Sequence, residues 1–162
     1  MKSLIIYSSK SGNTGKLADA VRSFLPGEKI CKSVEEEPET DGFDLICVGF
    51  WFQSGKADPA SAKLLQKLDS QAPLFIFATH GAAGESNHAR DGMKQAKELA
   101  ASCSVIGTFS CQGEVSPGVL AKAQSMDQPP AWIKDAPSAV GHPDGEDINE
   151  LGQILQKVLR SL

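Results

Sequence analysis

Residues 8–14, near the start of the chain, combine the side chains that suit binding of a phosphate group. They read Ser-Ser-Lys-Ser-Gly-Asn-Thr and join an apolar stretch to an amphipathic one. Hydroxyl groups donate hydrogen bonds without adding charge, and Gly12 lets the backbone approach a ligand closely. A helix that starts here would add unpaired N–H groups and a positive dipole end. The alternative is a simple helix cap, but a cap needs only one Ser, Asn or Thr.

Other phosphate-binding motifs do not fit these residues. Walker A requires G-x-x-x-x-G-K-[ST], whereas Lys16 is followed by Leu17 and Lys10 holds the position of the first glycine. No G-x-G-x-x-G follows the first apolar stretch, which argues against a dinucleotide fingerprint. None of the cysteines begins the C-x-x-x-x-x-R motif of a cysteine phosphatase, and the acidic residues of a phosphorelay receiver are missing.

Apolar stretches alternate with amphipathic ones along the chain, which is typical of βαβ units and a parallel sheet. Strands are predicted at residues 3–8, 29–34, 43–52, 74–79 and 105–111. Helices are predicted over residues 13–25, from Asp58-Pro59, from Ser86, and from residues 144–147 to the end of the chain. The nearly continuous apolar run 43–52 predicts a central strand that is covered on both faces. Two lysines in residues 29–34 indicate a sheet edge.

Residues 112–147 form a long segment between the fifth predicted strand and the last helix, and five prolines interrupt it. Ser116-Pro117 predicts the start of a short helix through residues 121–126, and the rest is predicted to be irregular. A loop of this length in a compact domain is often functional. The segment either merely joins two elements or covers a site. Residues 1–162 as a whole are predicted to form a single domain.

Composition narrows the classes of function. The chain has 162 residues, of which 41% are hydrophobic and 22% charged, as in one ordinary globular domain. The net charge of −4 disfavours a polyanionic partner, so no nucleic acid is expected. No apolar run approaches the roughly 20 residues that span a membrane. The N-terminal residues lack a secretory-signal pattern, so we expect a cytoplasmic protein.

Residues 9–14, Ser-Lys-Ser-Gly-Asn-Thr, resemble the phosphate-loop signature of the flavodoxin family, [ST]-x-[ST]-G-N-T. The order of the predicted elements is also similar to flavodoxin over residues 1–111 and in the last helix. The resemblance implies an α/β fold, a flavodoxin-like three-layer sandwich with a five-stranded parallel sheet in order 2-1-3-4-5 and helices on both faces. It further implies FMN at the carboxyl ends of the strands and electron transfer through the flavin.

The same resemblance assigns three loops to the cofactor. The implied FMN-binding residues are Ser9, Lys10, Ser11, Gly12, Asn13 and Thr14 for the phosphate, then Trp51, Phe52, Gln53, Ser54, Gly55 and Lys56 on one side of the ring, and Thr79, His80, Gly81, Ala82 and Ala83 on the other. Trp51 is the expected ring contact, because an aromatic side chain stacks on a flat apolar ring. Neighbouring residues of a strand face opposite sides, so either Trp51 or Phe52 closes the core.

Finer assignments in these loops stay open. Gly55 would let a backbone carbonyl turn toward the flavin, and His80 either contacts the ring or a substrate or is solvated. Flavodoxins commonly place a tyrosine in the second ring loop, whereas the only tyrosine here is Tyr7, inside the first strand. Trp132, in the long segment, could reach the edge of the flavin. No metal is expected, since His80, His88 and His142 show no metal-ligand spacing.

Two redox functions follow from this interpretation. The first is an FMN-binding electron carrier that passes electrons to a partner redox protein and needs no catalytic side chain. The alternative is an FMN-dependent NAD(P)H oxidoreductase acting on a quinone or another small acceptor, although no nicotinamide-binding motif is visible. A non-redox domain with a phosphate ligand is a third possibility, which the aromatic residues Trp51 and Phe52 disfavour. We favour the carrier, while noting that a net charge of −4 is small for steering a basic partner.

Overall fold

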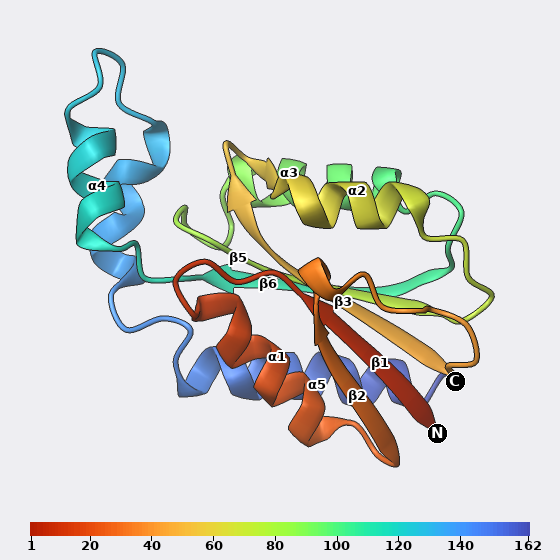
Figure 1. Cartoon of the computed structure of the whole chain (residues 1–162). Coiled ribbons are helices and arrows are strands. Elements are labelled where there is room, and N and C mark those ends of the chain that lie inside the picture. Colours follow the sequence, from red (N-terminus) through yellow and green to blue (C-terminus); the bar gives the residue numbers. More distant parts are fainter.

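A computed structural model describes residues 1–162, and its core is a parallel sheet with strand order β2-β1-β3-β5-β6. The short strand β4 lies outside this order, so β5 and β6 are the fourth and fifth parallel strands and the order is the predicted 2-1-3-4-5. Figure 1 shows the sheet between two layers of helices. The parallel strands are β1 (Lys2–Tyr7), β2 (Glu28–Ser33), β3 (Leu45–Gln53), β5 (Leu74–His80) and β6 (Val105–Gln112). A two-residue strand, β4 (Lys56–Ala57), pairs antiparallel with the end of β3 and was not predicted.

Helices cover both faces of the sheet, as expected. On one face lie α1 (Asn13–Phe24) and α5 (Gly145–Leu159), and on the other lie α2 (Pro59–Lys67) and α3 (Asn87–Leu99). A short 3₁₀ turn, η1 (Val34–Glu36), follows β2. None of the helices is both long and apolar enough to cross a membrane.

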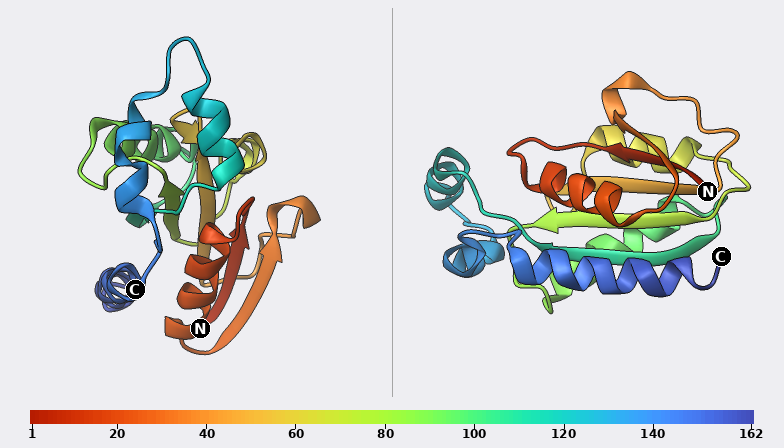
Figure 2. Two further views of the ribbon diagram at one scale, coloured as in Figure 1. Left: turned by 90° about the vertical axis from the view of Figure 1, so that its left-hand side faces the viewer. Right: turned by 90° about the horizontal axis from the view of Figure 1, so that it is seen from below.

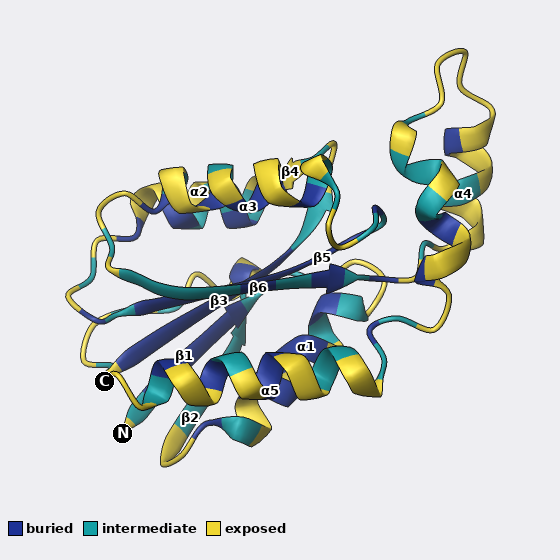
Figure 3. Ribbon diagram, turned by 180° about the vertical axis from the view of Figure 1, so that it is seen from behind, coloured by how far each residue is buried: buried dark blue, intermediate teal, exposed yellow.

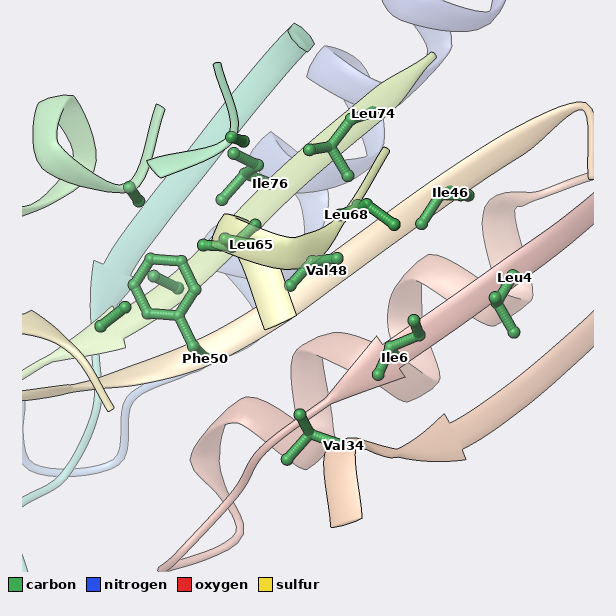
Figure 4. Packing of buried hydrophobic residues seen from close by; sticks show 14 of the residues in the cluster. Leu4, Ile6, Val34, Ile46, Val48, Phe50, Leu65, Leu68, Leu74 and Ile76 are labelled. Atoms are coloured by element: carbon green, nitrogen blue, oxygen red, sulfur yellow. The ribbon is translucent and has the colours of Figure 1, made fainter. Parts of the chain in front are cut away.

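The strands divide the core into two clusters because successive side chains point to opposite faces. In β3, Ile46, Val48 and Phe50 face α2 and α3, and Figure 4 shows this cluster. Leu45 and Cys47, from the same strand, face α1 and α5. All five are buried, which confirms that the run beginning at residue 43 builds a central strand covered on both faces.

The segment between β6 and α5, residues 113–144, is called the insert below. It contains α4 (Pro117–Gln124), where a short helix was predicted, and η2 (Ala131–Ala139), a 3₁₀ helix in a region predicted to be irregular. The prediction failed for η2 because contacts with distant residues, rather than local propensity, fix this part of the chain. Figure 2 shows α4 and η2 projecting beyond the carboxyl ends of the strands, and Figure 3 shows their largely exposed surface.

Candidate functional site at the carboxyl edge of the sheet

Three loops that follow β1, β3 and β5 meet at the carboxyl edge of the sheet. The hydroxyl oxygens of Thr14 and Thr79 lie 2.9 Å apart and are buried, which joins the start of α1 to the end of β5. The indole Nε1 of Trp51 donates to Ser8 Oγ at 3.2 Å, which joins the end of β3 to the loop after β1. The structure therefore brings together all three loops that the sequence assigned to one site.

The phosphate loop, residues 8–14, presents free donors at the start of α1. Gly12 occupies the N-cap position with a φ of 94°, in the left-handed region that favours glycine, and provides no side-chain cap. Ser9 Oγ accepts from Gly15 N at 3.1 Å. The backbone N–H groups of Asn13 and Thr14 have no acceptor in the chain. A capping side chain satisfies one such group, as Ser9 does for Gly15, so the N–H groups of Asn13 and Thr14 remain available to an anion at the helix N-terminus.

Trp51 and Phe52 point to opposite faces of the sheet. Trp51 lies on the side of the phosphate loop, partly exposed, and Lys10 Nζ lies 5.3 Å from the centroid of its ring. Phe52 lies on the other side, with ring centroids 5.1 Å from His80 and 5.8 Å from His88. Of the two aromatic residues, Phe52 thus packs, partly buried, against the core cluster that faces α2 and α3, and Trp51 flanks the phosphate loop.

The predicted loop 51–56 is a tight hairpin rather than an irregular loop. β3 continues to Gln53, and the two turn residues Ser54 and Gly55 have φ values of 52° and 80°. Positive φ at both positions is typical of the two-residue turns that suit twisted hairpins. The hairpin is held at its base, where Asp58 N donates to the Trp51 carbonyl at 3.1 Å. Gln53, Ser54 and Lys56 are exposed.

His80, at the end of β5, is 4% exposed, so the solvated alternative is wrong. Burial lowers the pKa of His80 to about 4, and its imidazole is therefore neutral near pH 7. Nδ1 lies 2.9 Å from the carbonyl oxygen of Ala82, which can only accept, so Nδ1 carries the proton. The buried Nε2 has no hydrogen-bond partner. Thr79 and Ala82 are also buried, whereas Gly81 and Ala83 are partly exposed.

The insert contributes contacts to this site that the sequence analysis missed. Asp135 Oδ2 accepts from Ala83 N at 3.0 Å, and a Cβ on Gly81 would lie 3.4 Å from the Trp132 ring. Asn13 Nδ2 donates to the carbonyl of Glu114 at 2.9 Å. Trp132 was singled out from the sequence, but nothing marked Asp135, because its contact joins residues 52 positions apart.

Other polar groups of the structure do not offer a better anion site. His142 Nδ1 lies 2.6 Å from Asp147 Oδ2, and Asp144 Oδ1 accepts from two N–H groups at the start of α5. These side chains fasten the end of the insert to α5. Surface hollows of about 250 and 200 Å³ lie beside α5 and β6, and both are lined by Glu85 and Glu150. Carboxylates in that position disfavour a phosphate ligand.

Comparison with known proteins identifies relatives of this chain. The model of the family described as "Flavodoxin domain" matches residues 4–156. A flavodoxin-like domain-containing protein, BilS, of Clostridium symbiosum (strain WAL-14163) is 30% identical over 173 aligned positions, which cover 91% of this chain and 90% of the relative. BilS of Clostridioides difficile (strain CD3) is 25% identical over 171 positions, with coverage of 98% and 97%.

Solved structures share the fold. A flavodoxin from the domain Archaea superposes with a TM-score of 0.66 at 14% identity, over 99% of this chain and 98% of that one. A flavoprotein in complex with FMN from Lactobacillus acidophilus NCFM gives a TM-score of 0.56 at 21% identity, over 67% of this chain and 92% of that one. The family model spans nearly the whole sheet and all three loops of the site, and the chain therefore belongs to the flavodoxin family.

Proposed function

We propose that the protein binds FMN at the carboxyl edge of the sheet and carries electrons to a partner redox protein. The observation that carries the proposal is the pairing of a free anion site with an aromatic side chain. The N–H groups of Asn13 and Thr14 lack acceptors, and the Trp51 indole is bonded to Ser8 in the same loop. FMN combines a phosphate with a flat ring, so one molecule would satisfy both features.

The residues present fit the phosphate of FMN. Ser11, Gly12 and Lys10 are exposed around the start of α1, and the helix dipole favours a negative group there. A hydroxyl group both donates and accepts. If Thr79 donates to Thr14, the proton of the Thr14 hydroxyl is directed elsewhere and can serve the phosphate. Only one cation, Lys10, lies within the loop, so binding would depend mainly on neutral donors and the dipole.

The residues beside the ring would bind it and exclude water. Trp51 would stack on one side, and the hairpin holds it in place through the bond from Asp58 N. The loop with Gly81 and Ala83 would cover another part of the ring. When bound, FMN supplies the redox chemistry, whereas the protein supplies binding, orientation and electrostatics.

The proposal favours a carrier over a stand-alone reductase because the side chains of the three loops would position the cofactor and none of them is placed to transfer a proton. His80 is the titratable side chain buried in these loops, and it is neutral and enclosed. The FMN complex of the structurally similar flavoprotein from Lactobacillus acidophilus supports the choice of cofactor.

Because the insert contacts two of the three loops, we propose that residues 1–162 act as a single domain.

Purification followed by anaerobic reduction tests the proposal. We expect a yellow protein that binds FMN more tightly than riboflavin, because riboflavin lacks the phosphate. Dithionite should reduce the bound flavin fully, and NADH or NADPH alone should reduce it slowly. Rapid reduction by NAD(P)H with turnover of a quinone would instead support the reductase alternative. A protein that binds neither FMN nor riboflavin would refute the flavin site altogether.

A further inference from the structure

The insert contacts the second proposed ring loop, residues 79–83, through backbone and side-chain groups, and one of these groups is charged. Asp135, in η2, accepts a hydrogen bond from Ala83 N through Oδ2 at 3.0 Å. The neighbouring Trp132 packs over Gly81, where a Cβ would lie 3.4 Å from its ring. Two residues of the loop, Gly81 and Ala83, are therefore contacted by two residues of one short helix.

Asp135 is itself held in place by its surroundings. Its carbonyl oxygen accepts from Ser138 Oγ at 2.7 Å and from Gln112 Nε2 at 3.3 Å. Gln112 and Ser138 also bond to each other through their side chains. Gln112 is the last residue of β6, so this network connects Asp135 to the rigid sheet.

No basic side chain forms an ion pair with the carboxylate of Asp135. The ion pairs of the structure involve other residues, so no Lys, Arg or His nitrogen lies within 4.0 Å of Asp135. A partly buried charge without a counter-ion acts over several ångströms, because screening is weaker there than in water.

We infer that Asp135 is a positioning residue of the proposed FMN site, which fixes the loop at Ala83 and places a negative charge beside it. This inference rests on the proposed function. Reduction adds negative charge to a flavin ring, and a fixed carboxylate nearby opposes that charge. Asp135 would therefore keep the loop in shape for the oxidised cofactor and make full reduction less favourable. The insert then forms part of the cofactor site rather than a mere connection.

Three variants of the full chain test the inference. Asp135→Asn keeps an acceptor oxygen and removes the charge, and Asp135→Ala removes both. Asp127→Asn is the matched control, because Asp127 is an exposed acidic residue of the same insert with no bond to the ring loop. Each variant is compared with the wild type in its dissociation constants for FMN and riboflavin, its anaerobic midpoint potentials, and the thermal midpoint of the apoprotein.

We expect Asp135→Ala to weaken binding of both FMN and riboflavin about tenfold, as loss of one charge-assisted hydrogen bond would do. The ratio of the two constants should not change, because the phosphate loop is unaltered. Asp135→Asn should favour the reduced flavin by up to about tenfold, equivalent to about 59 mV for a one-electron couple. Asp127→Asn should match the wild type in every measurement.

Two results would overturn the inference while leaving FMN binding intact. In the first, neither Asp135 variant differs from Asp127→Asn in affinity or potential. In the second, affinity falls but the potential stays constant, which would make Asp135 a purely structural residue. If Asp135→Ala does not fold, as circular dichroism would show, the potential of Asp135→Asn decides. A wild-type protein that binds no flavin would overturn the proposed function and this inference together.

Discussion

The hydroxyl groups of Thr14 and Thr79 form a buried hydrogen bond of 2.9 Å between the first turn of α1 and the end of β5, where the second ring loop begins. Two loops far apart in the sequence are thereby locked to each other beneath the proposed cofactor. The bond connects the phosphate end of the site with its ring end.

Replacing either threonine by valine tests this connection. Thr14→Val and Thr79→Val should each lower the free energy of unfolding by about 1–3 kcal/mol, because each leaves a buried hydroxyl unsatisfied. The double variant should lose less than the sum. Only Thr14→Val should also reduce the preference for FMN over riboflavin, since Thr14 belongs to the phosphate loop. Urea denaturation and flavin titration give both quantities, and equal preferences in the two single variants would contradict the assignment.

Substitution of Trp51 should mainly affect FMN binding, whereas substitution of Phe52 should mainly affect the stability of the apoprotein. Phe52→Ala removes a ring that packs on His80 and His88, so the apoprotein should lose about 3 kcal/mol of unfolding free energy. Trp51→Ala should cost less stability but weaken FMN binding about tenfold, because the stacking partner is lost. Guanidinium denaturation and quenching of flavin fluorescence measure the two effects. Weaker FMN binding in Phe52→Ala than in Trp51→Ala would reverse the roles proposed for these residues.

Gly92, in α3, leaves the space in which the β3–β4 hairpin packs against this helix. A Cβ at this position would collide with the Phe52 ring and lie 2.9 Å from the Gly55 carbonyl oxygen. Gly92→Ala should therefore destabilise the protein by about 1–3 kcal/mol, despite the better helix propensity of alanine. Gly118→Ala in α4 is the control, because a Cβ there meets nothing within 4 Å and should be neutral or stabilising. Combining Gly92→Ala with Phe52→Ala should recover part of the loss in thermal denaturation, and full additivity would argue against the collision.

His80 should make stability depend on pH. Its pKa is about 4 in the folded protein, below the ordinary value of 6.5, because burial disfavours the imidazolium. The unfolded chain therefore binds the proton more readily between these values, and the free energy of unfolding falls as pH drops from 6.5 toward 4. The slope should approach about 1.4 kcal/mol per pH unit. His80→Gln should flatten this region of the profile, whereas His88→Gln, which replaces the other histidine beside Phe52, should retain it.

The sequence predicted those parts of the molecule that depend on local pattern. The apolar periodicity predicted the five parallel strands. The polar residues after β1 predicted an anion site, which stays a prediction. Both signals lie within a few neighbouring residues. The alternation of side chains along β3 also predicted that Trp51 and Phe52 would separate, with one closing the core.

The remaining features depend on contacts between distant residues, which periodicity does not encode. η2 is stabilised by Asp135 on Ala83 and by Trp132 on Gly81, so its own sequence predicts only an irregular segment. The burial of His80 likewise involves a distant residue, Phe52, whose ring centroid lies 5.1 Å from that of the imidazole. A loop histidine carries no sign of this environment in the sequence.

The contact between Ala83 and Asp135 also sets an order of events during synthesis of the chain. A ribosome adds about 5–20 residues per second, so the 52 positions between these two residues correspond to roughly 3–10 s. During that interval the phosphate loop and the hairpin have already been synthesised, but the second ring loop lacks its contact with Asp135. If the proposed site binds FMN, the loop that covers the ring gains this contact only when about a sixth of the chain remains to be synthesised.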